Sequence, residues 1–409
     1  MADARALQAE VCVVGAGPAG LVVALLLQQA QIPCVVLERL SREAFHRVAG
    51  AGLIEDRTVR ALEAHGLAEP ILIHGGTNSV CEFRFEGQSC VLDYGALTGG
   101  RGSFVYPQHE LVAWLAERFV GNGGEIQFGV RAIKVEQVAD AATVFAVAEK
   151  TGQPVQIRCE FLAGCDGARS TLLDGITDAS VFELQHPFRW FALIAAAAPS
   201  KPRTLYGFHP RGFAGQLRRS PNLTRFMLEV PRGSTLADWP DERIWAELQQ
   251  RLHADGEPEL AQGPFIERDV LDLRVRVIEP MHHHRLYLAG DSAHLITPAA
   301  GKGMNLAIQD AIELGLALRE RCTSDREGTR LAEYSNTRLP AIWRTQEFSN
   351  WMLTLFFARL EQSATPATDG DSSHASDFAY RLRRARLQEL IDNRELRSWF
   401  SHAYAGVDP

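Results

Sequence analysis

The segment HPRGFAGQLRRS, residues 209–220, gathers three arginines, Arg211, Arg218 and Arg219, around an apolar GFAG. Its glycines, proline and charges predict a loop that leads into a strand over NLTRFMLEV, residues 222–230. A guanidinium presents a planar fork of donors that suits carboxylates and phosphates. The cluster therefore has two interpretations, a solvated surface turn and an anion-binding site.

A glycine motif near the N-terminus predicts a dinucleotide site. Gly15, Gly17 and Gly20 form G-x-G-x-x-G after the apolar run at residues 11–14 and before a helical segment. The first glycine permits a tight turn, the second lets a pyrophosphate approach the backbone, and the third lets the helix pack on the sheet. Glu38 ends the next buried strand, where it can accept hydrogen bonds from ribose hydroxyls. Its charge would repel a 2′-phosphate, so this site favours FAD or NAD over NADP.

Two later motifs also follow buried strands. GCDGARS, residues 164–170, contains Asp166, which by itself is equally well explained as a turn residue and as a ligand contact. AGDSAHLITPAAGKGMNLAIQDA, residues 289–311, contains Asp291 at a strand end, ahead of a helix that starts near Gly303. The N–H groups at the start of that helix would face an anionic ligand.

The elements that must position these motifs fall into two groups. Strands that alternate with helices predict an α/β, Rossmann-like domain, and a strand-rich stretch with one helix at DERIWAELQQRL predicts an inserted antiparallel β-sheet domain. The chain then ends in a helical region. The expected boundaries are residues 1–76, 103–180 and 281–328 for the discontinuous Rossmann-like domain, 77–102 and 181–280 for the substrate domain, and 329–409 for the helical region.

The composition of the chain limits the classes of protein to which it can belong. The 409 residues are 46% hydrophobic and 22% charged, as in ordinary globular proteins. A net charge of -8 argues against nucleic-acid binding, and no apolar run is long enough for a membrane span. The N-terminus MADARALQAE lacks the regions of a signal peptide. The seven cysteines are scattered without a CxxC pair, which predicts reduced thiols, no metal site and a cytoplasmic location.

The three motifs in this order resemble the flavoprotein aromatic hydroxylases, the single-component FAD monooxygenases. The resemblance covers nearly the whole chain, including HPRGFA, WPDERIWAELQQRL, RLYLAGDSAHLITPAAGKGMNLA and RLPAIWRTQEFSNWM. It is strongest for the members that convert 4-hydroxybenzoate to 3,4-dihydroxybenzoate. It implies an FAD-binding domain, NADPH or NADH as reductant, molecular oxygen, a C4a-hydroperoxyflavin that hydroxylates an aromatic acid in catabolism, and a homodimer.

The resemblance also implies which residues contact the flavin. The first motif would bind the ADP half of FAD, the Asp166 motif would serve FAD and NAD(P)H, and the Asp291 motif would bind the ribityl-diphosphate. The backbone N–H groups of Met304 and Asn305 would point at the flavin O2. The implied cofactor-binding residues are Gly15, Gly17, Gly20, Glu38, Arg39, Arg47, Gln108, Asp166, Asp291, Gly303, Met304 and Asn305.

For the substrate, the resemblance implies a binding and a proton-relay role. Arg219 matches the arginine that anchors the carboxylate, and Pro298 would lie against the ring. Tyr206 and Tyr404 match the two tyrosines that carry the phenol proton outward, because a tyrosine hydroxyl both donates and accepts. Arg225 matches an arginine near the flavin.

Three positions among those implied for the substrate and the proton relay depart from the family pattern. Leu217 replaces a small hydroxyl residue and Met227 replaces a tyrosine, both near the carboxylate. The histidine of the relay falls on Asn78, with His74 four residues earlier. These changes keep open a different aromatic substrate, such as an aminobenzoate or a larger biosynthetic phenol. A flavoprotein oxidase or electron carrier is the alternative from another class, and the two relay tyrosines argue against it.

The reductant is indicated less directly. Gly50 stands where the family's R-x-R-A-G pattern has an arginine, and Leu173 stands where the family has another arginine. Arg42, Arg47 and Arg169 would compensate for these losses. We therefore expect NAD(P)H without choosing between the two forms.

Overall fold

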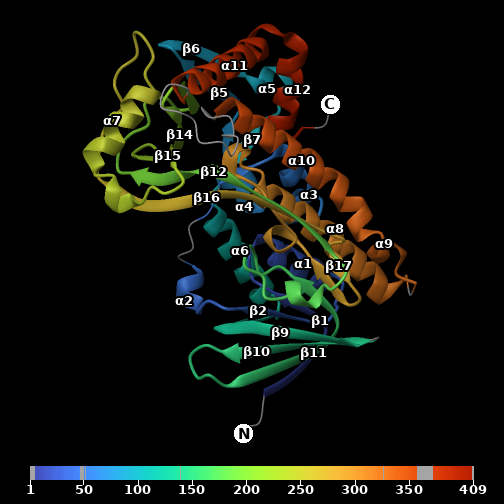
Figure 1. Ribbon diagram of the computed structural model, residues 1–409. Coiled ribbons are helices and arrows are strands. Elements are labelled where there is room, and N and C mark those ends of the chain that lie inside the picture. Colours follow the sequence, from blue (N-terminus) through green and yellow to red (C-terminus); the bar gives the residue numbers. More distant parts are fainter. Residues whose placement is uncertain are drawn as a thin grey trace. The chain divides into compact units, whose positions relative to one another are not determined.

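The computed structural model describes residues 5–46, 50, 52–138, 140–325, 327–356 and 372–407, with the side chains of residues 372–377 excepted. The chain crosses repeatedly between two compact units (Figure 1). The first unit comprises Met1–Thr77, Phe104–Leu184 and Val275–Glu347, and the second comprises Asn78–Ser103, Gln185–Arg274 and Phe348–Pro409. The helical segment 329–409 therefore does not form a unit of its own, because its first part belongs to one unit and its remainder to the other.

The first unit is built on a sheet whose central strand is β1 (Arg5–Val14). Strand β1 pairs in parallel with β2 (Cys34–Glu38) and with β11 (Pro154–Gly164), which is the arrangement of a Rossmann-like fold. Residues 11–14 are buried, as a β-branched run in a parallel sheet requires. The sheet is completed by β8 (Glu125–Phe128), β9 (Val130–Val138), β10 (Ala141–Ala148), β17 (His282–His283) and β18 (Leu286–Leu288).

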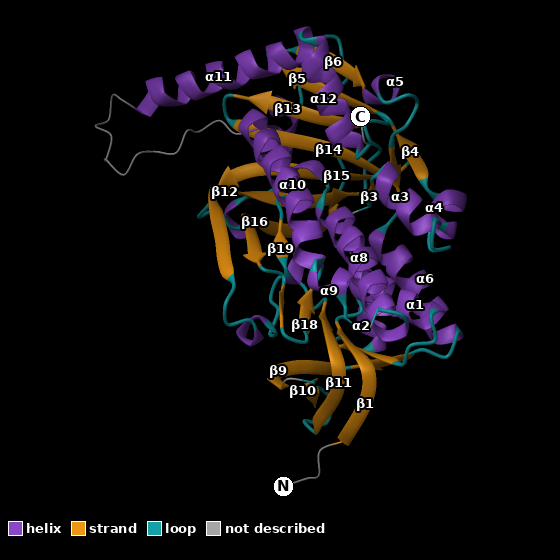
Figure 2. Ribbon diagram, turned by 90° about the vertical axis from the view of Figure 1, so that its right-hand side faces the viewer, coloured by secondary structure: helices purple, strands orange, loops and turns teal. Residues whose placement is uncertain are grey.

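Helices α1 (Pro18–Gln29) and α8 (Gly303–Thr323) pack closely in the first unit (Figure 2). A Cβ atom on Gly315 would lie 2.7 Å from the Leu26 side chain, so the glycine permits the two helices to approach. The Gln28 side chain also donates to the Phe119 carbonyl of helix α6 (Gln108–Gly121) at 2.9 Å. The helices of this unit are α1, α2 (Arg42–Phe45), α3 (Asp56–Glu63), α4 (Glu69–His74), α6 (Gln108–Gly121), α8 and α9 (Thr329–Ala332), and α10 (Tyr334–Phe356) begins there.

The second unit contains a mostly antiparallel sheet in the strand order β16-β12-β15-β14-β13-β5-β6. Its strands are β5 (Val80–Phe85), β6 (Gln88–Asp93), β12 (Ser180–Ala195), β13 (Thr204–His209), β14 (Gly212–Ser220), β15 (Leu223–Pro231) and β16 (Phe265–Glu279). Strands β12 and β16 each have residues in both units, and β16 pairs in the first unit with β19 (His294–Leu295). The helices are α5 (Tyr94–Leu97), α7 (Asp241–Arg251), α11 (Ser372–Asp392) and α12 (Arg394–Ala405). Among all the described helices, none is both long and apolar enough to span a bilayer.

The two faces of this second sheet have different partners. Leu205, Ala214 and Leu228 lie on one face, in a buried cluster with Trp245 of α7. Side chains alternate between faces along a strand. Tyr206 and its neighbours across the ladder, Gly215 and Met227, therefore lie on the opposite face, away from α7.

The expectation of a loop over residues 209–220 was wrong for most of its length. Residues 212–220 are strand β14, and a tight turn at residues 210–211 separates it from β13. Along this strand the side chains alternate between the two faces of the sheet, and Phe213, Gly215 and Leu217 share one face. The glycines and arginines make this alternation hard to recognise in the sequence. Strand pairing on both sides overrides the loop preference of these residues.

Candidate functional site

The glycine motif forms a turn that leaves no room for side chains at two of its positions. Gly15 has φ 101°, and a Cβ atom there would lie 2.3 Å from the Cys165 carbonyl oxygen. A Cβ atom on Gly20 would lie 1.9 Å from the carbonyl oxygen of Gly15. Gly17 differs, because nothing lies within 4 Å of its Cβ position. It is the N-cap of α1, so the start of that helix stays open to a ligand.

A cavity of about 670 Å³ lies at this turn, wholly within the first unit. Most of the cofactor-binding residues expected from the sequence line it. They are Gly15, Gly17, Glu38, Arg39, Gln108, Asp166, Asp291 and Met304. Gly20, Gly303 and Asn305 do not line it, and Arg47 lies outside the described residues. Arg169, expected from the sequence to assist with NAD(P)H, also lies on the wall.

Glu38 is held in place by the backbone around it. Its carboxylate accepts hydrogen bonds from the N–H of Ala16 at 3.0 Å and of Leu40 at 2.9 Å. Each carboxylate oxygen has two lone pairs, so one acceptor site per oxygen is still available. The side chain is thus oriented on the cavity wall and can accept hydroxyl donors from a ligand.

Asp166 has an acceptor that the protein does not use. One carboxylate oxygen accepts from the Thr171 N–H at 2.9 Å, while the other is buried and finds no hydrogen-bond partner among the described residues. Burial raises the pKa of this carboxyl. Asp291 is a third acid on the wall, together with Glu38 and Asp166, and it is exposed. A buried, unsatisfied acceptor fits a ligand that brings hydroxyl or N–H donors, as FAD does.

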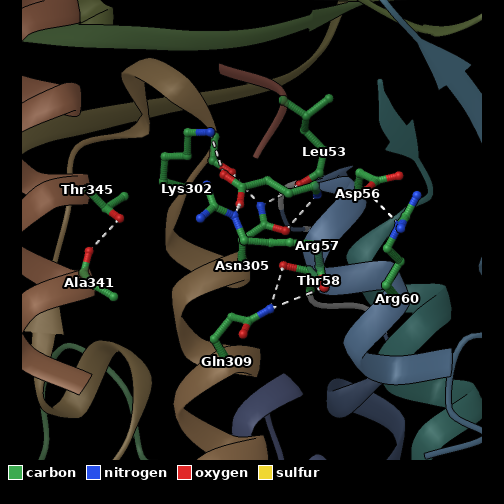
Figure 3. Close-up of polar contacts among 12 residues, drawn as sticks. Leu53, Asp56, Arg57, Thr58, Arg60, Lys302, Asn305, Gln309, Ala341 and Thr345 are labelled. Atoms are coloured by element: carbon green, nitrogen blue, oxygen red, sulfur yellow. Dashed lines mark hydrogen bonds and ion pairs between the residues drawn. The ribbon is translucent and has the colours of Figure 1, made fainter. Parts of the chain in front are cut away.

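The start of α8 is tied to the segment before α3 (Figure 3). The Asn305 side chain donates to the carbonyls of Leu53 at 3.0 Å and Gly301 at 2.9 Å, and accepts from the Glu55 N–H at 2.8 Å. Buried Lys302 pairs with the buried Glu55 carboxylate. Asn305 therefore acts in this structure by its side chain, which sets the position of the backbone N–H groups at the helix start.

Buried contacts of the Asp310 carboxylate, here called the Asp310 clamp, hold the turn that carries Asp291. The sequence did not predict them. The Asp310 carboxylate accepts from the Gly290 N–H at 3.1 Å, from Arg338 at 2.7 Å, and pairs with His294. These ion partners lower the pKa of Asp310 against the effect of its burial. The segments that carry them are far apart in the chain, so only their tertiary contact shows that Asp310 fixes the turn that presents Asp291.

In the second unit, Tyr206 of β13 and Tyr404 of α12 are joined by a hydrogen bond. Their hydroxyl oxygens are 2.6 Å apart, and both side chains are buried. Burial raises the pKa of both phenols. Both hydroxyls thus stay protonated at neutral pH, and each can pass on one proton while it accepts another.

Leu217 and Met227, which were expected near the substrate carboxylate, share the Tyr206 face of the sheet. Leu217 lies opposite Arg225 across the β14–β15 ladder, and Met227 lies opposite Gly215. Arg219 sits at a register shift between Arg218 and Ser220, which marks a bulge in β14. Burial, assisted by the nearby Arg225 charge, lowers the pKa of Arg219 to about 10. A half-buried guanidinium beside a second one favours an anionic ligand.

The other two arginines of this segment have different surroundings. Arg211 bonds to the Glu247 carboxylate of α7 and so has a structural partner. Arg218 pairs with Thr224 on the opposite face from Leu217, and its side chain is exposed. Pro298, expected against the substrate ring, begins a short 3-10 turn (Pro298–Ala300) in the first unit and is exposed.

The cavity, the glycine turn and the acidic side chains on the cavity wall define a dinucleotide-binding protein. Comparison with known proteins identifies its family. Residues 8–349 match the FAD binding domain family. The chain is also 30% identical over 405 residues to the p-hydroxybenzoate hydroxylase of Acinetobacter baylyi, covering 98% of this chain and 96% of that one. The chain belongs to the FAD-dependent aromatic hydroxylases, a family of flavoprotein monooxygenases.

Other relatives carry different names. A 3-(3-hydroxy-phenyl)propionate/3-hydroxycinnamic acid hydroxylase of Mycobacterium sp. (strain JLS) is 30% identical over 76% of this chain, which spans about half of that protein (53%). A 12-dehydrotetracycline 5-monooxygenase/anhydrotetracycline 6-monooxygenase of Streptomyces rimosus is 29% identical over 81% of this chain and 66% of its own. The fold matches p-nitrophenol 4-monooxygenase of Pseudomonas putida DLL-E4 with TM-score 0.76 and 19% identity, over 98% of both chains.

Proposed function

We propose that this protein hydroxylates a phenolic aromatic carboxylate, 4-hydroxybenzoate to 3,4-dihydroxybenzoate by default, with FAD and with NADPH or NADH as reductant. The hydrogen-bonded Tyr206–Tyr404 pair carries the proposal, since Tyr206 shares a sheet face with Arg225, whose charge acts on Arg219. A buried phenol pair beside a guanidinium suits a substrate with a carboxylate and a hydroxyl.

The residues of the first unit fit FAD. The open N-terminus of α1 would take the pyrophosphate, Glu38 and the unsatisfied Asp166 oxygen would accept from hydroxyl groups, and Asp291 would face the ribityl-diphosphate. The start of α8, which has no side-chain cap, would direct N–H groups at the flavin ring. Bound FAD, reduced by NADPH or NADH, supplies the electrons that activate oxygen and transfer one oxygen atom to the ring.

The residues of the second unit would bind the substrate and move its proton. Arg219 would pair with the carboxylate, and the dry surroundings that depress its pKa would strengthen that pair. Tyr206 would accept the phenol proton at its oxygen and pass its own to Tyr404. The resulting phenolate is richer in electrons at the carbon that receives oxygen.

Leu217 and Met227 support an alternative substrate for the same chemistry. Both lie on the Tyr206 face, and Met227 is buried. Apolar side chains at these two positions give the carboxylate fewer hydrogen bonds and suit a larger or less polar ring. An aminobenzoate or a larger biosynthetic phenol is therefore the second candidate.

The proposal is tested by NAD(P)H oxidation with a panel of aromatic acids, with hydroxylated product and hydrogen peroxide measured together. We expect at least one phenolic carboxylate to stimulate oxidation and to give stoichiometric product. Oxidation with peroxide and no product would identify an effector. A rate that no aromatic acid changes, with either coenzyme, would refute the proposed function.

A further inference from the structure

The two acidic turns of the cavity, residues 165–171 and 289–293, begin at strand ends that are joined by hydrogen bonds. The carbonyl of Gly164, the last residue of β11, accepts from the N–H of Ala289 at 2.9 Å. The same carbonyl accepts from the hydroxyl of Ser292 at 2.5 Å. These bonds fix the place where each turn starts.

The middle of the first turn has a different anchor. Ala168 lies two residues beyond Asp166 and lines the cavity. Its carbonyl accepts a hydrogen bond from Nη2 of Arg276 at 3.1 Å. The far end of the turn is held separately, because the Thr171 hydroxyl donates to the Ala132 carbonyl at 3.1 Å. The Arg276 contact thus holds the stretch of the turn that lies between its two fixed ends.

The same nitrogen of Arg276 also reaches the second turn. Nη2 donates to the Asp291 carbonyl at 3.3 Å, and this nitrogen carries two hydrogens, one for each carbonyl. Arg276 lies on β16, where it pairs with Leu295 of β19, and it is buried. All of these residues belong to the first unit. A guanidinium held on a strand therefore ties the turn of Ala168 to the turn of Asp291.

We propose that Arg276 is a positioning residue for FAD, a role that rests on the placement of FAD in this cavity under the proposed function. Residues 165–171 have no helix or strand of their own, so ordering them costs conformational entropy. Because the guanidinium orders them in the FAD-free protein, FAD binding does not have to supply that ordering, and the affinity is higher. Arg276 does not line the cavity, so it acts through the backbone of the two turns.

The first measurement is the affinity of the FAD-free protein for FAD, by titration of flavin fluorescence. Arg276→Met removes both hydrogen bonds, and we expect the affinity to fall roughly tenfold to a hundredfold. Arg276→Lys keeps a charged donor on a flexible stem and should recover part of the loss. Arg189→Met is the control, because that arginine also donates to a backbone carbonyl, of Ser234 at 3.1 Å, but in the second unit. Its affinity for FAD should be normal.

The second measurement needs no FAD. Arg169 follows Ala168 and is exposed, so trypsin cuts after it when the turn opens locally. We expect the FAD-free Arg276→Met protein to be cut there about tenfold faster than the unaltered protein, and Arg189→Met to be cut at the normal rate. Mass spectrometry of the fragments identifies the site. Arg276→Gln has a shorter, neutral side chain that should not bridge the carbonyls, and it carries both measurements if Arg276→Met does not fold.

The outcomes separate this role from the proposed function. An affinity and a cleavage rate that both equal those of the unaltered protein would overturn the role of Arg276. Weaker FAD binding without faster cleavage would also overturn it, because the turn would then be ordered without the arginine. Neither result affects the assay with aromatic acids. If no aromatic acid stimulates NAD(P)H oxidation while the Arg276 variants bind FAD weakly and are cut faster, the proposed hydroxylation fails and the role of Arg276 stands.

Discussion

Tyr206 and Tyr404 are separated by 198 positions in the chain, yet their hydroxyl oxygens lie 2.6 Å apart. A strand supplies the first tyrosine and the last helix supplies the second, within one compact unit. The bond aligns two protonated phenols so that one can pass a proton to the other.

Replacing Tyr206 by phenylalanine should separate binding from chemistry. The aromatic surface remains, so the affinity for the substrate should stay largely intact. The phenol loses its proton acceptor, and we expect the yield of hydroxylated product per NAD(P)H to fall, with turnover lower by roughly a hundredfold. Product and NAD(P)H measured in the same assay check this. An unaltered yield would remove Tyr206 from the mechanism.

Replacing Arg219 by alanine should weaken the binding of a benzoate by about 2–4 kcal/mol, because a charge-assisted hydrogen bond in a partly dry site is lost. Arg218→Ala is the matched control, since that neighbouring arginine is exposed and lies on the other face of the sheet. Equilibrium titration of flavin absorbance measures both. Equal affinities for the two variants would exclude Arg219 as the anchor.

Substitution of Leu217 by serine together with Met227 by tyrosine should shift the substrate preference. Each new hydroxyl would offer the carboxylate a hydrogen bond worth about 1 kcal/mol, at the expense of room for a larger ring. We expect the ratio of kcat/KM for 4-hydroxybenzoate to that for a larger phenol to rise. An unchanged ratio would show that these positions do not determine specificity.

Asp166→Asn should stabilise the FAD-free protein at neutral pH. Burial raises the carboxyl pKa above its ordinary value of 3.8, so the folding free energy becomes less favourable as pH rises above that value and the buried group ionises. The amide cannot ionise and so avoids this cost. At pH 7 the thermal midpoint of Asp166→Asn should therefore exceed that of the unaltered protein. This difference should become smaller as pH falls toward 4. Asp174→Asn, at an exposed position, should show no such gain. A lower midpoint for Asp166→Asn at pH 7 would contradict the assignment.

The buried Lys302–Glu55 pair should be costly to break from one side. Lys302→Met leaves the buried Glu55 carboxylate with Arg57 as its remaining ion partner, and we expect a loss of about 1–3 kcal/mol in the free energy of unfolding. Adding Glu55→Gln should recover part of that loss, which urea denaturation of the single and double variants measures. Lys134→Met, which breaks an exposed pair with Glu136, should cost about 0–1 kcal/mol. Additive losses at 55 and 302 would show that the pair is not coupled.

Features set by neighbouring residues could be predicted from the sequence. The turn at Gly15–Gly20 depends on positive φ and close backbone contacts, which only glycine allows, and the buried run before it identifies the strand. The expectation that the protein hydroxylates an aromatic acid came from the family resemblance, which covers nearly the whole chain. Most of the expected cofactor residues line one cavity in the structure, whereas the roles of the substrate residues remain predictions.

Features that depend on distant segments were decided only by the tertiary structure. Residues 212–220 have the composition of a loop, and their pairing with β13 and β15 makes them a strand with a bulge at Arg219. The Asp310 clamp and the contacts of Arg276 with Ala168 and Asp291 join segments whose approach leaves no periodic signal in the sequence. Sequence periodicity reports which face of an element is buried. It does not report which partner covers that face, because the register of strands and the docking of helices are settled by the fold as a whole.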